Sequence, residues 1–381
     1  MCTSWDVHKT IQNRGAFNRH AVIRTDRELS GELYSVTFDK SRAIAKESCF
    51  PLDGEGDMND HSKQKSINSR RSFIAGFGGV VAAAAALTRT TFSRSLKRES
   101  QLVPASPSTP RYTEHHISRD GVSLHVEDHG SGKPVVLLHG WPDSSRLWRN
   151  QIPFLVANGF RAIAPDQRGF GRSDRPEGVA AYSLQNAVAD LVGILDALGI
   201  DAADIVAHDW GASVAWLTAT AHPNRVRRLV VLSEPHPLAP YTLRQREIAW
   251  YQLFFQFEGI AEAWLQHDNW ALFREMLRGN GDVDRYISDL SRPDALKASL
   301  NWYRANIAPR LPEPPRKLPP VEAPTLGIWS SNDHYLDGER MKMSGQFVKA
   351  RWRYEQIDGA SHWIPLDAPD RLNRLLIEWL S

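Results

Sequence analysis

The sequence predicts an α/β fold, in which a mostly parallel sheet of eight strands carries helices on both faces and a helical domain is inserted near its end. Three observations lead to this expectation. Short apolar segments alternate with helical segments between residues 122 and 233. Turn and polar residues follow several of these apolar segments directly. Residues 236–316 then break the alternation, because they are aromatic and helical without a strand-like pattern and close on a proline-rich stretch.

The expected strands are short segments of apolar residues. The first, at residues 122–126, alternates apolar and polar residues and turns back through Gly130-Ser131-Gly132, so it is expected to form the antiparallel start of the sheet. Later strands are separated by helices such as the amphipathic segment 184–198, a spacing that predicts parallel pairing through crossovers. Those strands lie at residues 134–138, 160–163, 204–208, 228–233, 324–330 and 352–357.

The composition favours a protein that acts on a small molecule. The chain has 381 residues, and its 46 lysines and arginines nearly balance 44 aspartates and glutamates, so no nucleic-acid partner is expected. Both cysteines, Cys2 and Cys49, precede the segment with the strand pattern, which therefore offers no disulfide, thiolate metal site or thiol nucleophile. The sequence leaves the oligomeric state open.

The first third of the chain contains a segment that resembles a bacterial twin-arginine export signal. Ser69-Arg70-Arg71-Ser72-Phe73 precedes a Gly/Ala-rich apolar stretch of about fifteen residues, too short to span a bilayer comfortably, and Ala84-Ala85-Ala86 offers a cleavage site. The export machinery is then a partner, and the protein is periplasmic or secreted, or cytoplasmic if the signal is not used. The expected divisions are an unstructured or mis-assigned start at 1–57, with Met58 as the true start, a signal at 58–86 and a linker at 87–110.

A carboxylate occupies the turn after the strand at 204–208. Asp209 stands between this strand and an Ala-rich helix at 211–222, with the small residues Ala207 and Gly211 two positions before and after it. A strained turn from strand to helix needs small residues at these positions, because its backbone approaches its neighbours closely. The pattern predicts a nucleophile at this turn.

Three further strand ends carry residues that complete a nucleophilic site. The strand at 134–138 breaks into His139-Gly140-Trp141-Pro142, while Asp333 and His362 follow the last two expected strands. The order nucleophile, acid, histidine is the chain order of the α/β-hydrolase fold. Asp337 is a rival acid, but it lies further past its strand and is expected to begin a helix.

Residues 111–381 resemble the epoxide hydrolases of the α/β-hydrolase fold, a family close to the haloalkane dehalogenases. The resemblance lies in four segments: HGWP at 139–142, HDWGA at 208–212, and the aromatic segments 250–256 and 300–304. It implies an α/β-hydrolase core formed by residues 111–235 and 318–381, with a helical cap at 236–317.

The resemblance implies a hydrolysis in two steps. Asp209 would attack a ring carbon of an epoxide and form an alkyl-enzyme ester, and a water activated by His362, itself oriented by Asp333, would cleave that ester to release a vicinal diol. The implied partners are a small apolar epoxide and water. No metal ion or organic cofactor is implied.

Four further residues receive roles from the same resemblance. Tyr251 and Tyr303 would protonate the ring oxygen as it leaves carbon, because an alkoxide has a high proton affinity. The backbone N–H groups of Trp141 and Trp210 would bind the oxyanion that forms when water attacks the ester.

Two other functions remain open. A haloalkane dehalogenase would use the same Asp209 nucleophile, and the indole N–H of Trp210 would hold the released halide, although two cap tyrosines would contribute little to halide release. A non-catalytic, ligand-binding hydrolase fold is the second alternative. The complete set of nucleophile, base and acid disfavours it.

Overall fold

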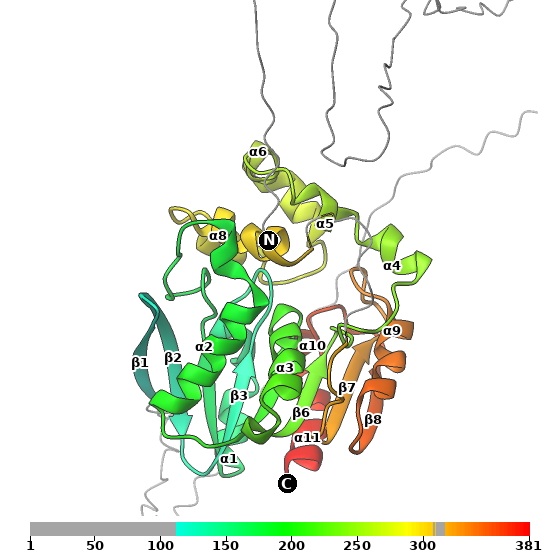
Figure 1. The fold of residues 1–381 in the computed structure, drawn as a ribbon. Coiled ribbons are helices and arrows are strands. Elements are labelled where there is room, and N and C mark those ends of the chain that lie inside the picture. Colours follow the sequence, from blue (N-terminus) through cyan, green and yellow to red (C-terminus); the bar gives the residue numbers. More distant parts are fainter. Residues whose placement is uncertain (1–111, 308, 310–316) are drawn as a thin grey trace, which may run out of the picture. The chain divides into compact units, whose positions relative to one another are not determined.

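The computed structural model describes residues 112–307, 309 and 317–381 (Figure 1). The expected export signal, the segment before it and the linker after it lie outside these described residues. Most of the proline-rich stretch after residue 307 also lies outside them. Within the described part, no helix has both the length and the apolar character needed to cross a bilayer.

The centre of the structure is an eight-stranded sheet (Figure 1). Its strands are β1 (Tyr112–Arg119), β2 (Val122–Gly130), β3 (Lys133–Leu138), β4 (Phe160–Pro165), β5 (Ala203–His208), β6 (Val226–Leu232), β7 (Thr325–Ser330) and β8 (Trp352–Ile357). Their spatial order is β1-β2-β4-β3-β5-β6-β7-β8. β2 pairs antiparallel with β1 and β4, whereas every pair from β4 to β8 is parallel, so the prediction of a mostly parallel sheet is confirmed.

Helices cover both faces of the sheet. Those packed on it are α1 (Ile152–Ala157), α2 (Leu184–Ala197), α3 (Trp210–Ala221), α9 (Gly338–Met343), α10 (Ile364–Asp367) and α11 (Pro369–Leu380). In Figure 1, α2 and α3 lie in front of the sheet, and α1 and α11 lie behind it. Short 3-10 helices occupy Ser145–Trp148, Val179–Tyr182, Pro223–Arg225 and Ser344–Phe347.

Five helices of the described chain lie between β6 and β7, and we call them and their connections the cap. They are α4 (Leu243–Ile248), α5 (Trp250–Phe254), α6 (Ile260–Met276), α7 (Val283–Leu290) and α8 (Ala295–Ile307). α6 consists of two helical pieces, because residues 267–270 leave the helical conformation and three of them have positive φ. Side chains of the cap and of the strand ends line the same cavity, so the cap covers the carboxyl edge of the sheet (Figure 1).

The residue pattern of β5 explains its central place. All six of its residues are buried, because β3 and β6 flank it and helices cover the sheet on both faces. α2 begins after Ser183, whose hydroxyl accepts a hydrogen bond from the Asn186 N–H, and it buries Val188, Leu191 and Leu195. Parallel strands held in this way end at one edge, where the loops that follow them meet.

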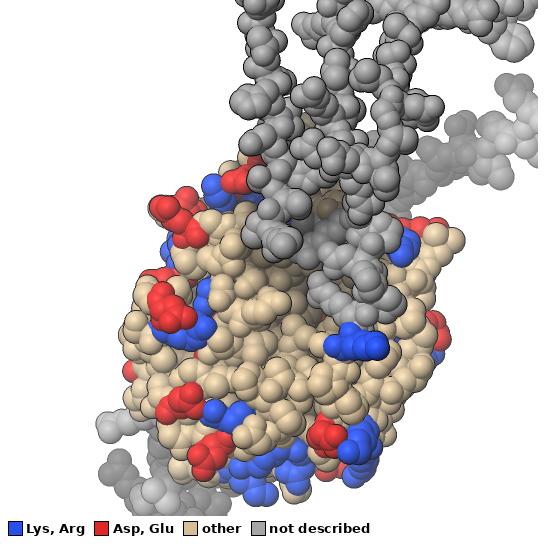
Figure 2. Space-filling view, viewed as in Figure 1, with Lys and Arg blue, Asp and Glu red and all other residues tan. Residues whose placement is uncertain are grey.

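Charged residues are not separated by sign on the surface that Figure 2 shows. Acidic and basic side chains of the described residues occur together around the margin of this face, and uncharged residues fill its centre. The mixture agrees with the near balance of charges in the sequence.

Candidate active site

Asp209 occupies a sharp turn between β5 and α3. Its φ of 52° and ψ of −125° lie in a region that residues other than glycine rarely adopt, at a cost of about 1–3 kcal/mol. Hydrogen bonds from the N–H groups of Ala212 and Ser213 to the Asp209 carbonyl, at 2.8 and 3.1 Å, hold the turn. The side chain consequently projects from the sheet edge into the space beneath the cap.

Two glycines make room for this turn. A Cβ on Gly211 would lie 2.5 Å from the Leu138 carbonyl oxygen, and a Cβ on Gly140 would lie 2.2 Å from Asp209 Oδ1. Cβ atoms do not approach other atoms this closely, so both positions require glycine. The requirement at Gly211 follows from the turn pattern, whereas the requirement at Gly140 comes from the loop after the neighbouring strand β3.

His362 stands between two carboxylates. Its Nδ1 lies 2.8 Å from Asp333 Oδ2, and its Nε2 lies 3.7 Å from Asp209 Oδ2. The Asp333 side chain is fully buried, and its Oδ1 accepts hydrogen bonds from the N–H groups of Tyr335 and Leu336 at 2.8 and 3.0 Å. The acid is therefore fixed by the backbone, and it fixes the histidine ring in turn.

The backbone of His362 is also held in place. Its carbonyl oxygen accepts hydrogen bonds from His208 Nε2 at 2.9 Å and from the Ser233 hydroxyl at 3.1 Å. His208 ends β5, and burial lowers its pKa to about 4. It stays neutral at physiological pH and serves as a hydrogen-bond donor to this carbonyl.

Burial and charge have opposite effects on the pKa values of Asp209 and His362. Burial favours the neutral form of His362, but the charges of Asp333 and Asp209 outweigh it and raise the pKa of His362. Burial would likewise raise the pKa of Asp209, but its interactions with His362 outweigh that effect and lower the pKa. The resting site therefore holds an ionised carboxylate beside a protonated histidine.

The loop after β3 brings an N–H donor to the Asp209 carboxylate. The Trp141 N–H donates to Asp209 Oδ1 at 2.7 Å. Trp210 is the first residue of α3, and its N–H adds to the lowering of the Asp209 pKa. His139 supports the loop, because its Nδ1 bonds to the next residue's carbonyl at 2.9 Å and its Nε2 accepts from the Gln167 N–H at 3.0 Å. Both nitrogens of His139 are thus used for structure.

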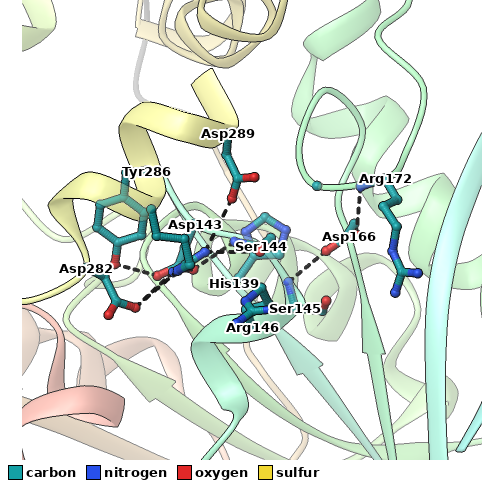
Figure 3. Close-up of polar contacts among 12 residues, drawn as sticks. His139, Asp143, Ser144, Ser145, Arg146, Asp166, Arg172, Asp282, Tyr286 and Asp289 are labelled. Carbon is teal, nitrogen blue, oxygen red and sulfur yellow. Dashed lines mark hydrogen bonds and ion pairs between the residues drawn. The ribbon is translucent and has the colours of Figure 1, made fainter. Parts of the chain in front are cut away.

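The same loop is tied to the cap through Asp143 (Figure 3). Asp143 is 2% exposed, and its Oδ1 accepts a hydrogen bond from the Arg285 guanidinium at 2.6 Å. Its Oδ2 accepts from the Tyr286 hydroxyl at 2.7 Å. Because both partners lie on α7, one buried carboxylate joins the cap to the loop that carries the Trp141 N–H.

Asp166 fixes the stretch that follows Asp143 (Figure 3). The Ser145 N–H donates to its Oδ1 and the Arg172 N–H to its Oδ2, both at 2.8 Å. Burial would raise the pKa of Asp166, but the hydrogen bond with His125 and these N–H contacts lower it to about 2. Asp166 therefore stays ionised at neutral pH and holds two loops together.

Asp209 lines two spaces under the cap. The larger, which we call the main cavity, measures about 250 Å³ and lies on the side of Trp210. The smaller, which we call the aromatic slot, lies on the side of His362, and its other lining residues are Trp141, Tyr251, Met276, Tyr303, Tyr335 and Trp363. Among the described residues, no three His, Cys, Asp or Glu side chains are grouped so as to hold a metal ion.

Tyr251 on α5 and Tyr303 on α8 line both spaces together with Asp209. Their side chains are buried, and their ring centroids lie 6.0 Å apart. Burial, and after it the charge of Asp209, raises the pKa of both hydroxyls well above the ordinary value. Both phenols consequently remain protonated at neutral pH and are able to donate a proton or a hydrogen bond.

The structure brings the residues proposed from the sequence to one place, namely Asp209, His362, Asp333, Tyr251, Tyr303, Trp141 and Trp210. Asp337 instead caps α9 by accepting the Glu339 N–H at 3.1 Å. The sequence reasoning missed three residues at the site: Asp143, Tyr335 and Glu234. Glu234 follows β6 almost directly, and the rule that ligands bind at the carboxyl ends of parallel strands would have pointed to it.

Comparisons with known proteins agree with this geometry. A family model described as alpha/beta hydrolase fold matches residues 133–369. Epoxide hydrolase A of Mycobacterium tuberculosis is 33% identical over 322 residues, covering 71% of this chain and 97% of that protein. Human epoxide hydrolase 4 is 31% identical over 311 residues, covering 76% of this chain and 84% of that protein.

Solved structures show the same likeness. The crystal structure of epoxide hydrolase A from Mycobacterium thermoresistibile matches with a TM-score of 0.60 at 29% identity, over 71% of this chain and 98% of that one. An epoxide hydrolase of Bacillus megaterium, solved in complex with an inhibitor, matches with a TM-score of 0.63 at 26% identity, over 70% of this chain and 99% of that one. The expected α/β-hydrolase fold is confirmed, and this chain is an enzyme that belongs to the epoxide hydrolase family.

Proposed function

We propose that the enzyme hydrolyses small epoxides to vicinal diols through a covalent ester on Asp209. One observation carries the proposal: two buried, protonated phenols, on Tyr251 and Tyr303, line the same cavity as an ionised carboxylate. A carboxylate together with O–H donors suits the opening of a three-membered ring, because a carbon is attacked while the ring oxygen takes up a proton.

In the first step, an Asp209 oxygen attacks a ring carbon and the ring carbon–oxygen bond breaks. Oδ2 is the better placed oxygen, since Oδ1 already accepts the Trp141 N–H. The electron pair of the broken bond goes to the ring oxygen, which takes a proton from one of the two phenols. The proton that His362 holds in the resting site then restores the phenol. Ester formation removes the Asp209 charge, which lowers the pKa of His362 and favours this transfer.

In the second step, neutral His362 takes a proton from water, and the hydroxide attacks the carbonyl carbon of the ester. The Trp141 N–H stabilises the oxyanion that develops on Oδ1, and the Trp210 N–H is the second donor. Collapse of this intermediate breaks the bond between the carbonyl carbon and the alkyl oxygen. His362 returns its proton to that oxygen and then takes the acid proton of Asp209, which restores the resting charges.

The covalent step is tested with two variants. His362→Gln should still open the ring but hydrolyse the ester at least about a hundredfold more slowly, because it lacks the base. Intact-mass spectrometry after adding a terminal epoxide should show the mass of one substrate added to His362→Gln and none to Asp209→Ala. Normal multiple turnover by His362→Gln without any added mass would rule out the ester.

The phenols separate this function from haloalkane dehalogenation by the same nucleophile. Tyr251→Phe and Tyr303→Phe should each slow ester formation from epoxides, and the double variant should lose more than either single variant predicts, since one phenol partly substitutes for the other. Ester formation from a bromoalkane of matched length should change little. A double variant that opens epoxides at the parent rate would favour the dehalogenase.

A further inference from the structure

The main cavity has a polar end that the proposed reaction does not use. Glu234 and Arg340 line this cavity together with Asp209, Trp210 and the phenol-bearing cap residues. Glu234 lies two residues beyond β6, and Arg340 lies on α9, so both belong to the core and not to the cap. Neither residue contacts the ring-opening or ester-cleaving groups through a hydrogen bond.

The backbone fixes the position of Glu234. Its N–H donates to the Leu232 carbonyl at 2.8 Å, and its carbonyl accepts from Trp216 Nε1 at 3.1 Å. Its carboxyl group makes no hydrogen bond with any of the described residues, and none of their cationic groups lies within 4.0 Å of it. Glu234 is only partly buried and faces the main cavity, so water in the cavity meets its carboxyl group, and a ligand that displaces this water can take its place as hydrogen-bond partner.

Arg340 contributes a positive charge to this end of the cavity, but its two terminal nitrogens already donate to other residues. It is 2% exposed, its two terminal nitrogens donate to Gln245 Oε1 at 3.3 Å and to the Ala239 carbonyl at 3.1 Å, and the Tyr241 ring stacks on its guanidinium at 4.0 Å. No carboxylate of the described residues lies within 4.0 Å of it. The charge therefore acts on whatever occupies the cavity, while direct bonding falls to Glu234.

Burial raises the pKa of Glu234 to about 8, although the charge of Arg340 acts in the opposite direction. The carboxyl group is then mostly protonated at neutral pH, and it both donates and accepts. Such a group pairs best with a ligand group that also donates and accepts. Hydroxyl and carboxamide groups have this property, and methyl groups do not.

The surrounding charges do not favour an ionic ligand group of either sign. Arg340 and the ionised Asp209 line the same cavity with opposite charges, so an ammonium or a carboxylate would be attracted by one of them and repelled by the other. Building on the proposed function, we infer that Glu234 forms a subsite for a neutral hydrogen-bonding group, a hydroxyl or carboxamide, on one arm of the epoxide.

Two epoxides of matched length test the subsite: 1,2-epoxyheptane, which ends in a methyl group, and 5,6-epoxyhexan-1-ol, which ends in a hydroxyl. The parent enzyme should prefer the hydroxyl compound by about tenfold in kcat/KM, the size of one well-placed hydrogen bond. Glu234→Met should remove this preference, and Glu234→Gln, which still donates and accepts, should retain it. Ser213→Ala, which changes another polar side chain of the same cavity, should leave the ratio unchanged.

Failure of the subsite is distinguishable from failure of the proposed function. Diol formation from both epoxides at equal kcat/KM, or a preference for 5,6-epoxyhexanoate, would reject the subsite while the reaction stands. If neither epoxide reacts, calorimetric binding of hexane-1,2,6-triol and of heptane-1,2-diol still decides. Tighter binding of the triol by the parent but not by Glu234→Met supports the subsite, and equal binding of the two polyols by the parent refutes it.

Discussion

At the residue scale, the candidate site is built from charges that hold one another in place. Asp209 is ionised because His362 carries a proton, and the Trp141 N–H binds the oxygen that faces away from the histidine. A substitution that shifts this carboxylate without changing a titrating group therefore tests the geometry alone. Gly140 offers such a position.

Gly140→Ala adds a methyl carbon that would lie 2.2 Å from Asp209 Oδ1. The whole Asp209 side chain must move, because its Cβ would also lie 2.4 Å from the added carbon, and the contact of Oδ1 with the Trp141 N–H is lost. We expect kcat for epoxide hydrolysis to fall by about a hundredfold, the typical effect of losing one oxyanion donor. Steady-state kinetics measure this effect, and thermal unfolding monitored by circular dichroism shows whether the fold persists.

Gly193→Ala is the matched control, because this glycine lies within α2, where an added Cβ meets only the flexible side chain of Arg119 at 3.3 Å. Activity should be unchanged, and the free energy of unfolding should rise by about 0.5–1 kcal/mol, since alanine is the better helix former. Parent-like kcat in Gly140→Ala would mean that Asp209 does not occupy the position described.

At the scale of the element, α7 ties the cap to the loop after β3 through Asp143 (Figure 3). Tyr286→Phe removes one hydrogen bond to this buried carboxylate and should lower the free energy of unfolding by about 1.5–3 kcal/mol. Amide hydrogens of α7 should exchange faster, and KM should rise more than kcat falls. Hydrogen exchange read by mass spectrometry localises the effect.

Tyr112→Phe provides the comparison, because it removes a tyrosine–carboxylate contact of 2.9 Å on exposed β1, away from the cap. It should leave the exchange of α7 and the KM as they are. If Tyr286→Phe behaves in the same way, Asp143 does not couple the cap to the loop after β3.

Most elements were predictable because each strand is an apolar segment between turn residues. β1 was not, since its residues alternate between exposed and half-buried and include His115 and His116 in place of apolar residues. The helix expected after Asp337 divides into α9 and a 3-10 helix at Ser344. The break in α6 was also missed, because neither proline nor glycine occurs between Ile260 and Met276 to mark it.

The candidate site was predictable to the extent that it depends on strand ends. Asp209, Asp333 and His362 each follow a strand, so their convergence follows from parallel pairing. Asp143 was missed because its partners come from α7, far along the chain. Glu234 was missed although it lies two residues after β6, because the sequence reasoning did not apply the strand-end rule to this strand.

At the scale of the whole molecule, export is the remaining proposal, and it concerns residues outside the described part. Changing Arg70 and Arg71 to lysine should leave the full-length precursor in the cytoplasm of a bacterial host, because the twin-arginine machinery reads the arginine pair. The parent should give a periplasmic species that begins near Leu87, as determined by N-terminal sequencing. A cytoplasmic protein that retains residues 58–86 would argue against a cleaved signal.

The position of the cap in the chain has a consequence for how this enzyme can diversify. The chain leaves the sheet after β6 and returns at β7, and these strands are paired neighbours, with Leu229 opposite Thr325. The cap is therefore an insertion whose replacement leaves the order and pairing of the strands unchanged. Asp209, Asp333 and His362 belong to the core, whereas Tyr251 and Tyr303 belong to the cap. A cap from another protein would change the residues that line the cavity. Its helices would also have to supply hydrogen-bond donors to Asp143 in order to pack on the core.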